Sequence, residues 1–334
     1  MSFTRKILAA ALAAGCVAVS LPAFADEAMP GKGVVVQPGQ DNNDGDNFQT
    51  LIVVQALRDL GYDVKDIQRA KFPVLHLAVA NGDVTFIADH WEATHQAFYD
   101  KAGGAEKMSR AGEYVKDTTF GYSIDTKTAN AHGITNFGQL KDPEIAKLFD
   151  TDGDGKADLV GCMPGWGCER DIEHHLDAYG LRNTVTHNQG EYDVIMADTI
   201  ARYKEGKPIL YYSWTPYWVE GALLHDKDVI WLEVPFSANP QGVDTKRPDG
   251  KNYGAIPQTI HILANKDFIG KNPAAAKLFE VMSLPVADVS AQNLRMKDEG
   301  RGDMAAAAQD AAAWIAAHRS AYDDWLKAAR AAAQ

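Results

Sequence analysis

Apolar and polar residues follow one another along this chain in blocks that predict strands and helices in turn. Short runs rich in β-branched and aromatic residues have the length of strands, and longer segments with an apolar residue every three or four positions have the period of helices. The predicted strands are 33–37, 62–67, 83–88, 120–124, 159–160, 208–214, 229–232 and 259–264. The predicted helices are 47–60, 72–79, one starting near 90, 143–149, 169–180, 192–204, one starting at 273, 286–296 and 304–333.

This alternation of strands and helices predicts an α/β fold with mainly parallel sheets. A chain of 334 residues with 46% hydrophobic content is long enough for two domains with sizeable cores. We expect lobe one to comprise residues 26–120 plus 262–334, and lobe two to comprise residues 121–261. The chain would then cross between the lobes twice.

Two of the predicted helices have apolar positions that suggest which side is buried. In 192–204 the expected buried face is Val194, Ile195, Ala197, Ile200 and Ala201. In the alanine-rich helix 304–333 large side chains recur at helical spacing, which favours a packing role for Trp314, Ile315, Tyr322 and Trp325.

Residues 1–25 have the pattern of a secretory signal peptide. Arg5 and Lys6 precede an apolar run over 7–19, and the Ala-Phe-Ala sequence at 23–25 fits signal-peptidase cleavage. We therefore expect a mature chain from Asp26 in the periplasm. The sequence before Cys16 distantly resembles a lipoprotein cleavage site, which leaves lipidation of Cys16 as an alternative. After residue 25 no apolar stretch reaches the ~18–20 residues that a membrane helix needs.

The charge balance argues against nucleic acid as a partner. The formal net charge is −12, and removal of Arg5 and Lys6 would make it more negative still. Proteins that bind nucleic acid need a basic face for the phosphates.

Cleavage would leave two cysteines, Cys162 and Cys168, in an oxidising compartment. There such a pair favours a disulfide over a metal site. The alternative from the enzyme class is a secreted thiol hydrolase with Cys168 as nucleophile and His187 as base, and it requires a free thiolate.

The segment between these cysteines, residues 161–168 (GCMPGWGC), would form a small ring at the start of a helix. The face of Trp166 attracts cations. The backbone N–H groups of Gly167, Cys168 and Glu169, at a helix N-terminus, attract anions. The ring thus suits a zwitterion, and the plain alternative is a stapled surface turn with a packing tryptophan.

Three predicted strand ends carry a tryptophan: Trp91, Trp166 and Trp214. Ligands of α/β sheets bind beyond the carboxyl ends of strands, so the three rings could form one aromatic cage. A quaternary ammonium group suits such a cage because it has no hydrogen to donate and is weakly hydrated. With a helix starting near His90, His95 would stand one turn after Trp91 and could receive a carboxylate together with Gly167 and Cys168. Trp218, Tyr211 and Tyr212 could also face the cleft, although strand alternation favours burial of at least half of them.

Four segments carry a resemblance to a known family: residues 161–168, 184–190 (TVTHNQG), 197–200 (ADTI) and 211–218 (YYSWTPYW). They resemble the periplasmic glycine betaine/proline betaine-binding proteins of osmoprotectant ABC importers, over nearly the whole mature chain. The resemblance implies a two-lobed periplasmic binding protein fold of type II, which closes over its ligand and delivers it to a membrane permease.

Carried over to this sequence, the resemblance implies a cage of Trp91, Trp166 and Trp214. It implies carboxylate contacts from His95, Gly167 and Cys168, and a disulfide between Cys162 and Cys168. Residues 92–94 depart from the family, which usually has threonine and proline after the first tryptophan.

The acidic loop 150–158 matches the front of an EF-hand calcium loop. The matching positions are Asp150, Asp152, Asp154, the Lys156 carbonyl and Asp158. The final bidentate glutamate is absent because Gly161 occupies its position. A structural calcium ion and a metal-free Asp/Gly turn both remain open, and no other cofactor is expected.

The resulting hypothesis is a non-enzymatic, monomeric receptor for betaines in the periplasm, which works with the permease of an ABC importer. A receptor for choline or carnitine with the same fold is the alternative within this class.

Overall fold

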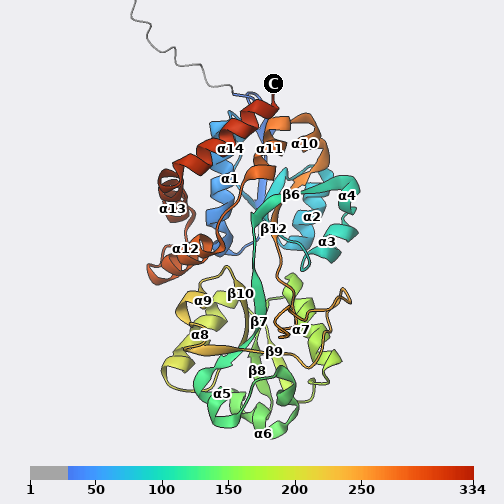
Figure 1. Cartoon of the computed structure of the whole chain (residues 1–334), viewed down its shortest axis with the longest axis vertical. Coiled ribbons are helices and arrows are strands. Elements are labelled where there is room, and N and C mark those ends of the chain that lie inside the picture. Colours follow the sequence, from blue (N-terminus) through green and yellow to red (C-terminus); the bar gives the residue numbers. More distant parts are fainter. Residues whose placement is uncertain (1–28) are drawn as a thin grey trace, which may run out of the picture.

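The computed structural model describes residues 29–334, so the predicted signal peptide and Cys16 lie outside the described residues. Two five-stranded sheets, each covered by helices, form two lobes that lie one beyond the other along the long axis of the molecule (Figure 1). The strand order is β4-β2-β5-β12-β6 in the first sheet and β11-β7-β10-β8-β9 in the second. The two-lobed α/β architecture expected from the sequence is confirmed.

The strands have the following bounds. The first sheet contains β2 (Pro38–Gln40), β4 (Gln68–Arg69), β5 (Phe86–Trp91), β6 (Met108–Val115) and β12 (Ile260–Asn265). The second contains β7 (Thr119–Asp125), β8 (Ala157–Val160), β9 (Val185–Asn188), β10 (Leu210–Thr215) and β11 (Val229–Leu232). A separate parallel pair joins β1 (Val35–Val36) to β3 (Asp63–Val64).

Helices surround both sheets. Those of the first lobe are α1 (Asn47–Asp59), α2 (Phe72–Asn81), α3 (Gln96–Lys101), α4 (Gly104–Lys107), α10 (Lys266–Lys271), α11 (Pro273–Val281), α12 (Val286–Asp298), α13 (Met304–Ala317) and α14 (Arg319–Ala332), with the 3₁₀ turn η1 (Asp44–Asp46). Those of the second lobe are α5 (Thr126–His132), α6 (Pro143–Ala146), α7 (Gly167–Ala178), α8 (Tyr192–Lys204) and α9 (Val219–Ala222), with η2 (Phe137–Lys141) and η3 (Lys147–Phe149).

The sheets are mixed rather than mainly parallel, so that expectation is wrong. β4-β2-β5 and β9-β8-β10 are parallel, whereas both neighbours of β12 and both neighbours of β7 pair with them antiparallel. The reason lies in the connections. A strand that follows a helical crossover within its own lobe is held parallel, but β7 and β12 enter their sheets from the other lobe.

The chain passes between the sheets twice, through residues 116–118 after β6 and through residues 233–259 after β11. The expected lobe boundaries, after residue 120 and before residue 262, fall inside β7 and β12. Whether the two lobes move as separate rigid units stays a prediction.

One local expectation, a helix that starts near His90, is wrong. No helix starts near His90, because β5 continues through Trp91 and α3 begins only at Gln96. All six residues of β5 are buried, and the strand pairs with β2 on one side and β12 on the other. Pairing on both sides outweighs the local helical spacing of Trp91 and His95.

Two predictions for helix faces had different outcomes. In α8 the buried residues are Tyr192, Met196 and Thr199, while Val194 is exposed, so the predicted face is wrong. The predicted C-terminal helix is divided at His318 into α13 and α14. The predicted packing role is confirmed for Ile315, Tyr322 and Trp325, which are buried. Trp314 is half-buried against Trp325.

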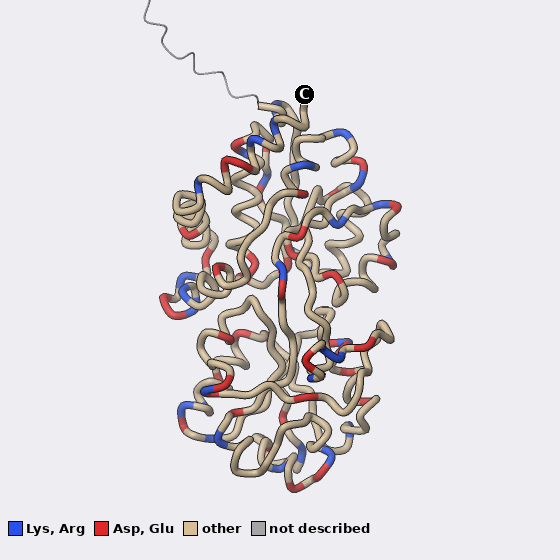
Figure 2. The backbone as a smooth tube through the Cα atoms, in the orientation of Figure 1, with Lys and Arg blue, Asp and Glu red and all other residues tan. Residues whose placement is uncertain are grey.

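Charged side chains are distributed over both lobes, with Lys and Arg interspersed among Asp and Glu (Figure 2). Among residues 29–334, no helix is both long enough and apolar enough to span a membrane.

Candidate functional site

A cavity of about 390 Å³, part of it open to solvent, lies where strand ends from both sheets meet. All six residues expected to bind a ligand line it. The complete lining is Asn43, Asp46, Phe72, Asp89, Trp91, Thr94, His95, Phe120, Trp166, Gly167, Cys168 and Trp214.

The three tryptophans reach this cavity from different elements. Trp91 is the last residue of β5, Trp214 is near the end of β10, and Trp166 is the residue that precedes α7. Trp166 and Trp214 meet edge to face, with ring centroids 5.5 Å apart, and Trp91 meets Phe120 edge to face at 4.9 Å. At least one ring from each sheet therefore faces the same space.

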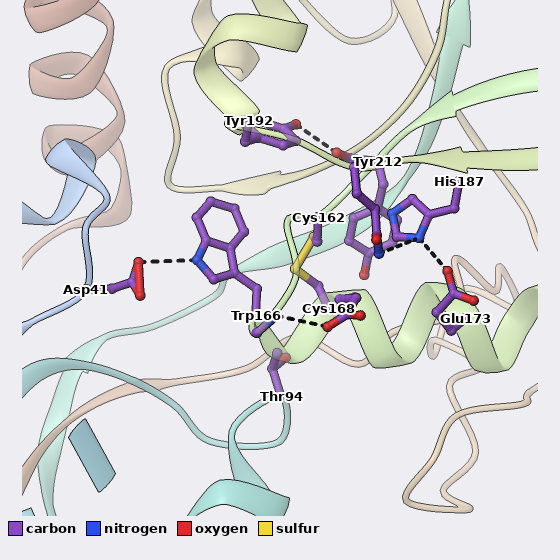
Figure 3. Close-up of a disulfide and its surroundings, with 12 residues drawn as sticks. Asp41, Thr94, Cys162, Trp166, Cys168, Glu173, His187, Tyr192 and Tyr212 are labelled. Carbon is purple, nitrogen blue, oxygen red and sulfur yellow. Dashed lines mark hydrogen bonds and ion pairs between the residues drawn. A yellow bond between two sulfur atoms is a disulfide. The ribbon is translucent and has the colours of Figure 1, made fainter. Parts of the chain in front are cut away.

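Cys162 and Cys168 form a disulfide, with 5.8 Å between their Cα atoms (Figure 3). The thiol hydrolase alternative loses its nucleophile, because the sulfur of Cys168 is already bonded. His187, the expected base, instead binds Glu173, with 2.7 Å between Nδ1 and Oε1. The bridge closes a short ring that holds Trp166 against the first turn of α7.

The first turn of α7 leaves free backbone donors in the wall of the cavity. Trp166 is the N-cap residue, and its side chain makes no capping hydrogen bond. The N–H groups of Gly167 and Cys168 have no partner within the helix, as at every helix N-terminus, and both residues line the cavity. This end of α7 can therefore bind an anionic group.

Position 167 accepts only glycine because the other lobe lies so close. A Cβ atom built on Gly167 would lie 2.3 Å from the carbonyl oxygen of Thr94, which follows β5. The Arg170 guanidinium also donates to this carbonyl, at 3.3 Å. The two lobes thus meet at the anion-binding end of the cavity.

His95 is held in one tautomer. The backbone N–H of Trp91 donates to its Nδ1 at 3.3 Å, so the ring proton of a neutral His95 is on Nε2. Burial, and next the nearby His76, lowers the pKa of His95 well below its usual value, which keeps the ring neutral. His95 can therefore donate one hydrogen bond without adding a positive charge beside an ammonium group.

A chain of hydrogen bonds lies behind His95. Arg110 Nε–H donates to His90 Nε2 at 2.8 Å, so His90 carries its proton on Nδ1 and donates to His76 Nε2 at 3.0 Å. His76 then donates from Nδ1 to the Phe72 carbonyl at 2.7 Å. Each ring nitrogen in the chain has a partner, and burial lowers the pKa of both histidines. We therefore assign them hydrogen-bonding roles rather than metal ligation.

Sequence reasoning missed part of the cavity wall, in particular the acids Asp46 and Asp89. Asp89 could have been found, because it lies two residues before Trp91 and strand alternation places both on one face. Asp46 gave no such signal. Its polar, glycine-containing segment looks like an ordinary loop before α1.

Trp218, Tyr211 and Tyr212 are buried and are not among the residues that line the cavity. The Trp218 indole donates to Asp193 at 2.8 Å, and the Tyr212 carbonyl accepts from Tyr192 at 2.7 Å. The expected core burial of these aromatic residues is confirmed.

The acidic loop lies in the second lobe, before β8. Oxygen atoms of Asp150, Asp152 and Asp158 lie within 4.8 Å of one another, whereas Asp154 is not part of this group. The carboxylates also accept hydrogen bonds from the loop itself, and Asp158 accepts from Thr151 and Asn188. The donor set fits calcium in part, and a structural calcium ion stays a prediction.

Comparisons with known proteins agree on one family. The family model described as the substrate binding domain of ABC-type glycine betaine transport systems matches residues 34–317. The glycine betaine-binding periplasmic protein OusX of Dickeya dadantii is 50% identical over 333 residues, which cover 99% of this chain and 100% of that protein. The glycine betaine/proline betaine-binding periplasmic protein of Escherichia coli is 52% identical over 316 residues, 94% of this chain and 95% of that protein.

Among solved structures, one similar fold is the glycine/betaine/L-proline-binding protein of a Borrelia burgdorferi ABC transporter. Its TM-score is 0.70 at 16% identity, and the alignment covers 90% of this chain and 100% of that chain. This comparison supports the two-lobed fold.

Proposed function

The chain belongs to the family of substrate-binding domains of ABC-type glycine betaine transport systems, and we propose that it binds glycine betaine or proline betaine in the cavity between its lobes. The observation that carries this proposal is the convergence of Trp91, Trp166 and Trp214 on one cavity that also receives the donors of α7.

At the cationic end, the tryptophan rings replace the water around the methylated ammonium group. The group is weakly hydrated and donates no hydrogen bond, so its desolvation costs little. At roughly 1–2 kcal/mol for each desolvated cation–π contact, three rings would contribute ~3–6 kcal/mol. This cage selects methylated over unmethylated ammonium groups, whose N–H donors would lose their water without gaining acceptors in the rings.

At the anionic end, the carboxylate of the ligand would accept from the N–H groups of Gly167 and Cys168 and from His95 Nε2–H. The dipole of α7 favours a negative charge at that position. Because these donors are neutral, they attract the carboxylate without repelling the ammonium group nearby.

The ligand would bridge the lobes, since Trp91 and His95 belong to the first lobe and the other four site residues to the second. A ligand that contacts both lobes only when they are together favours the closed arrangement. The closed protein would then deliver its ligand to the permease of an ABC importer. We further propose that the protein works in the periplasm as a monomer and catalyses no reaction, in line with the names of its relatives, which describe periplasmic binding proteins.

Isothermal titration calorimetry of the mature protein with glycine betaine, proline betaine, choline and proline tests this function. We expect tight binding of the two betaines and weak or absent binding of proline, which lacks the methyl groups. Choline keeps the trimethylammonium group but has no carboxylate. Choline bound more tightly than either betaine would favour the choline receptor instead, and no heat with any methylated ligand would refute both.

A further inference from the structure

Two carboxyl groups, those of Asp46 and Asp89, interact with each other in the wall of the cavity. Both residues line the cavity, and each is close enough to affect the pKa of the other. Asp46 is 9% exposed and Asp89 is 2% exposed. Two buried carboxylates that share a site repel each other when both are ionised, which favours a proton on one of them.

Asp89 lies directly beside the cage. It precedes Trp91 by two residues on the same face of β5, and both residues line the cavity. Its hydrogen bonding is incomplete, because Oδ1 of Asp89 is buried and has no donor among residues 29–334. A buried acceptor without a donor is costly, and this one belongs to a residue of the cavity wall.

Asp46 does not cap the helix that it precedes. It is the N-cap residue of α1, where an aspartate commonly accepts a backbone N–H, yet its side chain makes no such bond. It lines the cavity together with Asp89 instead. The pair therefore joins the start of α1 to the end of β5, two elements that bound the cavity.

The charged groups around the pair do not neutralise it. Asp41 and Asp44, from the connection before α1, add negative charge. Arg69 of β4 is the cation that acts on Asp46, but its guanidinium is engaged by Asp44 at 3.1 Å and Asn47 at 2.5 Å.

Two titratable groups from elsewhere in the site also face this region. His95, in the turn after β5, is neutral. Tyr217, beyond β10, donates its hydroxyl proton to Asp193 at 2.6 Å, and burial raises its pKa well above the usual value. The acids therefore dominate this part of the cavity.

Burial raises the pKa of Asp46 to about 7 and the pKa of Asp89 well above its usual value. Groups coupled this closely titrate as a unit. Above neutral pH the pair holds one proton and one negative charge, and below neutral pH it takes up a second proton and loses that charge.

We propose that Asp46 and Asp89 form a proton-sharing pair that supplies one negative charge to the ammonium end of the cavity and couples ligand affinity to pH. This inference rests on the proposed function, since it needs a cationic ligand. A permanent positive charge favours the ionised pair, so the ligand binds more tightly at high pH and its binding at low pH releases a proton.

Calorimetric titration of the mature protein with glycine betaine, in pairs of buffers with different ionisation enthalpies, measures this proton directly. From a pKa of about 7 in the free protein, we expect roughly tenfold weaker binding at pH 6 than at pH 8, with close to one proton released at pH 6 and none above about pH 8.5. As a control ligand, 3,3-dimethylbutanoate has the same shape and carboxylate but no positive charge, and its binding should release no proton.

The variants Asp89→Asn and Asp46→Asn should each abolish the proton release and flatten the pH profile. Asp63→Asn is the control, because it removes an exposed acid of β3 that neither lines the cavity nor acts on the pair, and it should retain the wild-type profile. Equal heats in both buffers together with a flat profile in the wild type would overturn the proton-sharing pair while leaving the betaine receptor standing. Absence of betaine binding at every pH would instead overturn the receptor itself.

Discussion

The indole Nε1–H of Trp166 donates to the Asp41 carboxylate at 3.3 Å, across the boundary between the two lobes (Figure 3). Asp41 follows β2 in the first lobe, and Trp166 precedes α7 in the second. One cage ring is therefore positioned by an acceptor from the opposite lobe. The bond joins the two lobes, so a separation of the lobes would break it.

We expect Asp41→Ala to weaken betaine binding about fivefold, because the loss of one such hydrogen bond costs about 1 kcal/mol. Calorimetry measures the affinity. Since the bond is absent when the lobes separate, the melting temperature of the ligand-free protein should change little. Asp63→Ala, an exposed acid on β3, is the control, and an Asp41→Ala protein with wild-type affinity would show that the bond does not assist closure.

We expect Trp166→Ala to lose more than tenfold in betaine affinity, since one desolvated cation–π contact of roughly 1–2 kcal/mol and the ring's packing against Trp214 are both removed. Circular dichroism should show a retained fold. Trp314→Ala removes a half-buried tryptophan of α13, far from the cavity lining, and should bind as the wild type does. Unchanged affinity in Trp166→Ala would refute the cage.

We expect Gly167→Ala to reduce betaine affinity at least tenfold, because the new Cβ would collide with the Thr94 carbonyl at 2.3 Å when the lobes meet. The collision involves the other lobe, so the free protein should still fold. The control is Gly190→Ala, whose Cβ would have only an ordinary contact of 3.4 Å with Ile195. If Gly167→Ala binds normally, the lobes do not approach as closely in the liganded state.

The acidic pair also predicts how stability depends on pH. Burial raises the pKa of Asp46 and of Asp89 in the folded state, so the folded chain holds more protons than the unfolded chain between about pH 4 and pH 7. This pair therefore contributes a loss of stability as the pH rises through that window. Thermal melts of wild type and Asp89→Asn at pH 5 and pH 8 measure it. The melting temperature of the variant should exceed that of the wild type by more at pH 8 than at pH 5. A larger difference at pH 5 would contradict the predicted loss of stability with rising pH.

For the loop of Asp150, Asp152 and Asp158, we expect millimolar calcium to raise the melting temperature by about 2–4 °C over the value in chelator, which corresponds to roughly 1 kcal/mol for a chain of this size. Magnesium at the same concentration should have a smaller effect, since it demands stricter geometry. Asp152→Asn should remove the calcium response. Identical melting temperatures in calcium and in chelator would show that the loop is a metal-free turn.

The cage tryptophans could be placed from the sequence because each lies at or after the end of a short apolar strand, and the carboxyl ends of strands from both sheets meet at the cavity. The disulfide ring could be predicted because Cys162 and Cys168 are close in sequence. Asp46 could not be placed in the same way, since its contact with Asp89 joins segments more than forty residues apart. Nothing local distinguishes an N-cap aspartate that caps its helix from one that does not.

The wrong predictions for the buried face of α8 and for a helix near His90 have a similar origin. Val194 has the right spacing for the core of α8, but the helix packs through Tyr192 and Met196 because Tyr192 reaches the cage beside Trp166. The helix predicted at His90 was displaced by strand pairing with β12, which arrives from 170 residues later in the chain. Both outcomes depend on tertiary partners that local periodicity does not reveal.

The two crossings between the lobes differ greatly in length, and this difference has a practical consequence. Residues 116–118 are too few to accept an insertion without altering how the lobes meet, whereas residues 233–259 include an exposed turn at Asp249 and Gly250. A fluorescent protein inserted at that turn would leave the cavity lining intact. Its brightness would respond as the lobes come together, which would make the chain a reporter of methylated osmolytes in living cells.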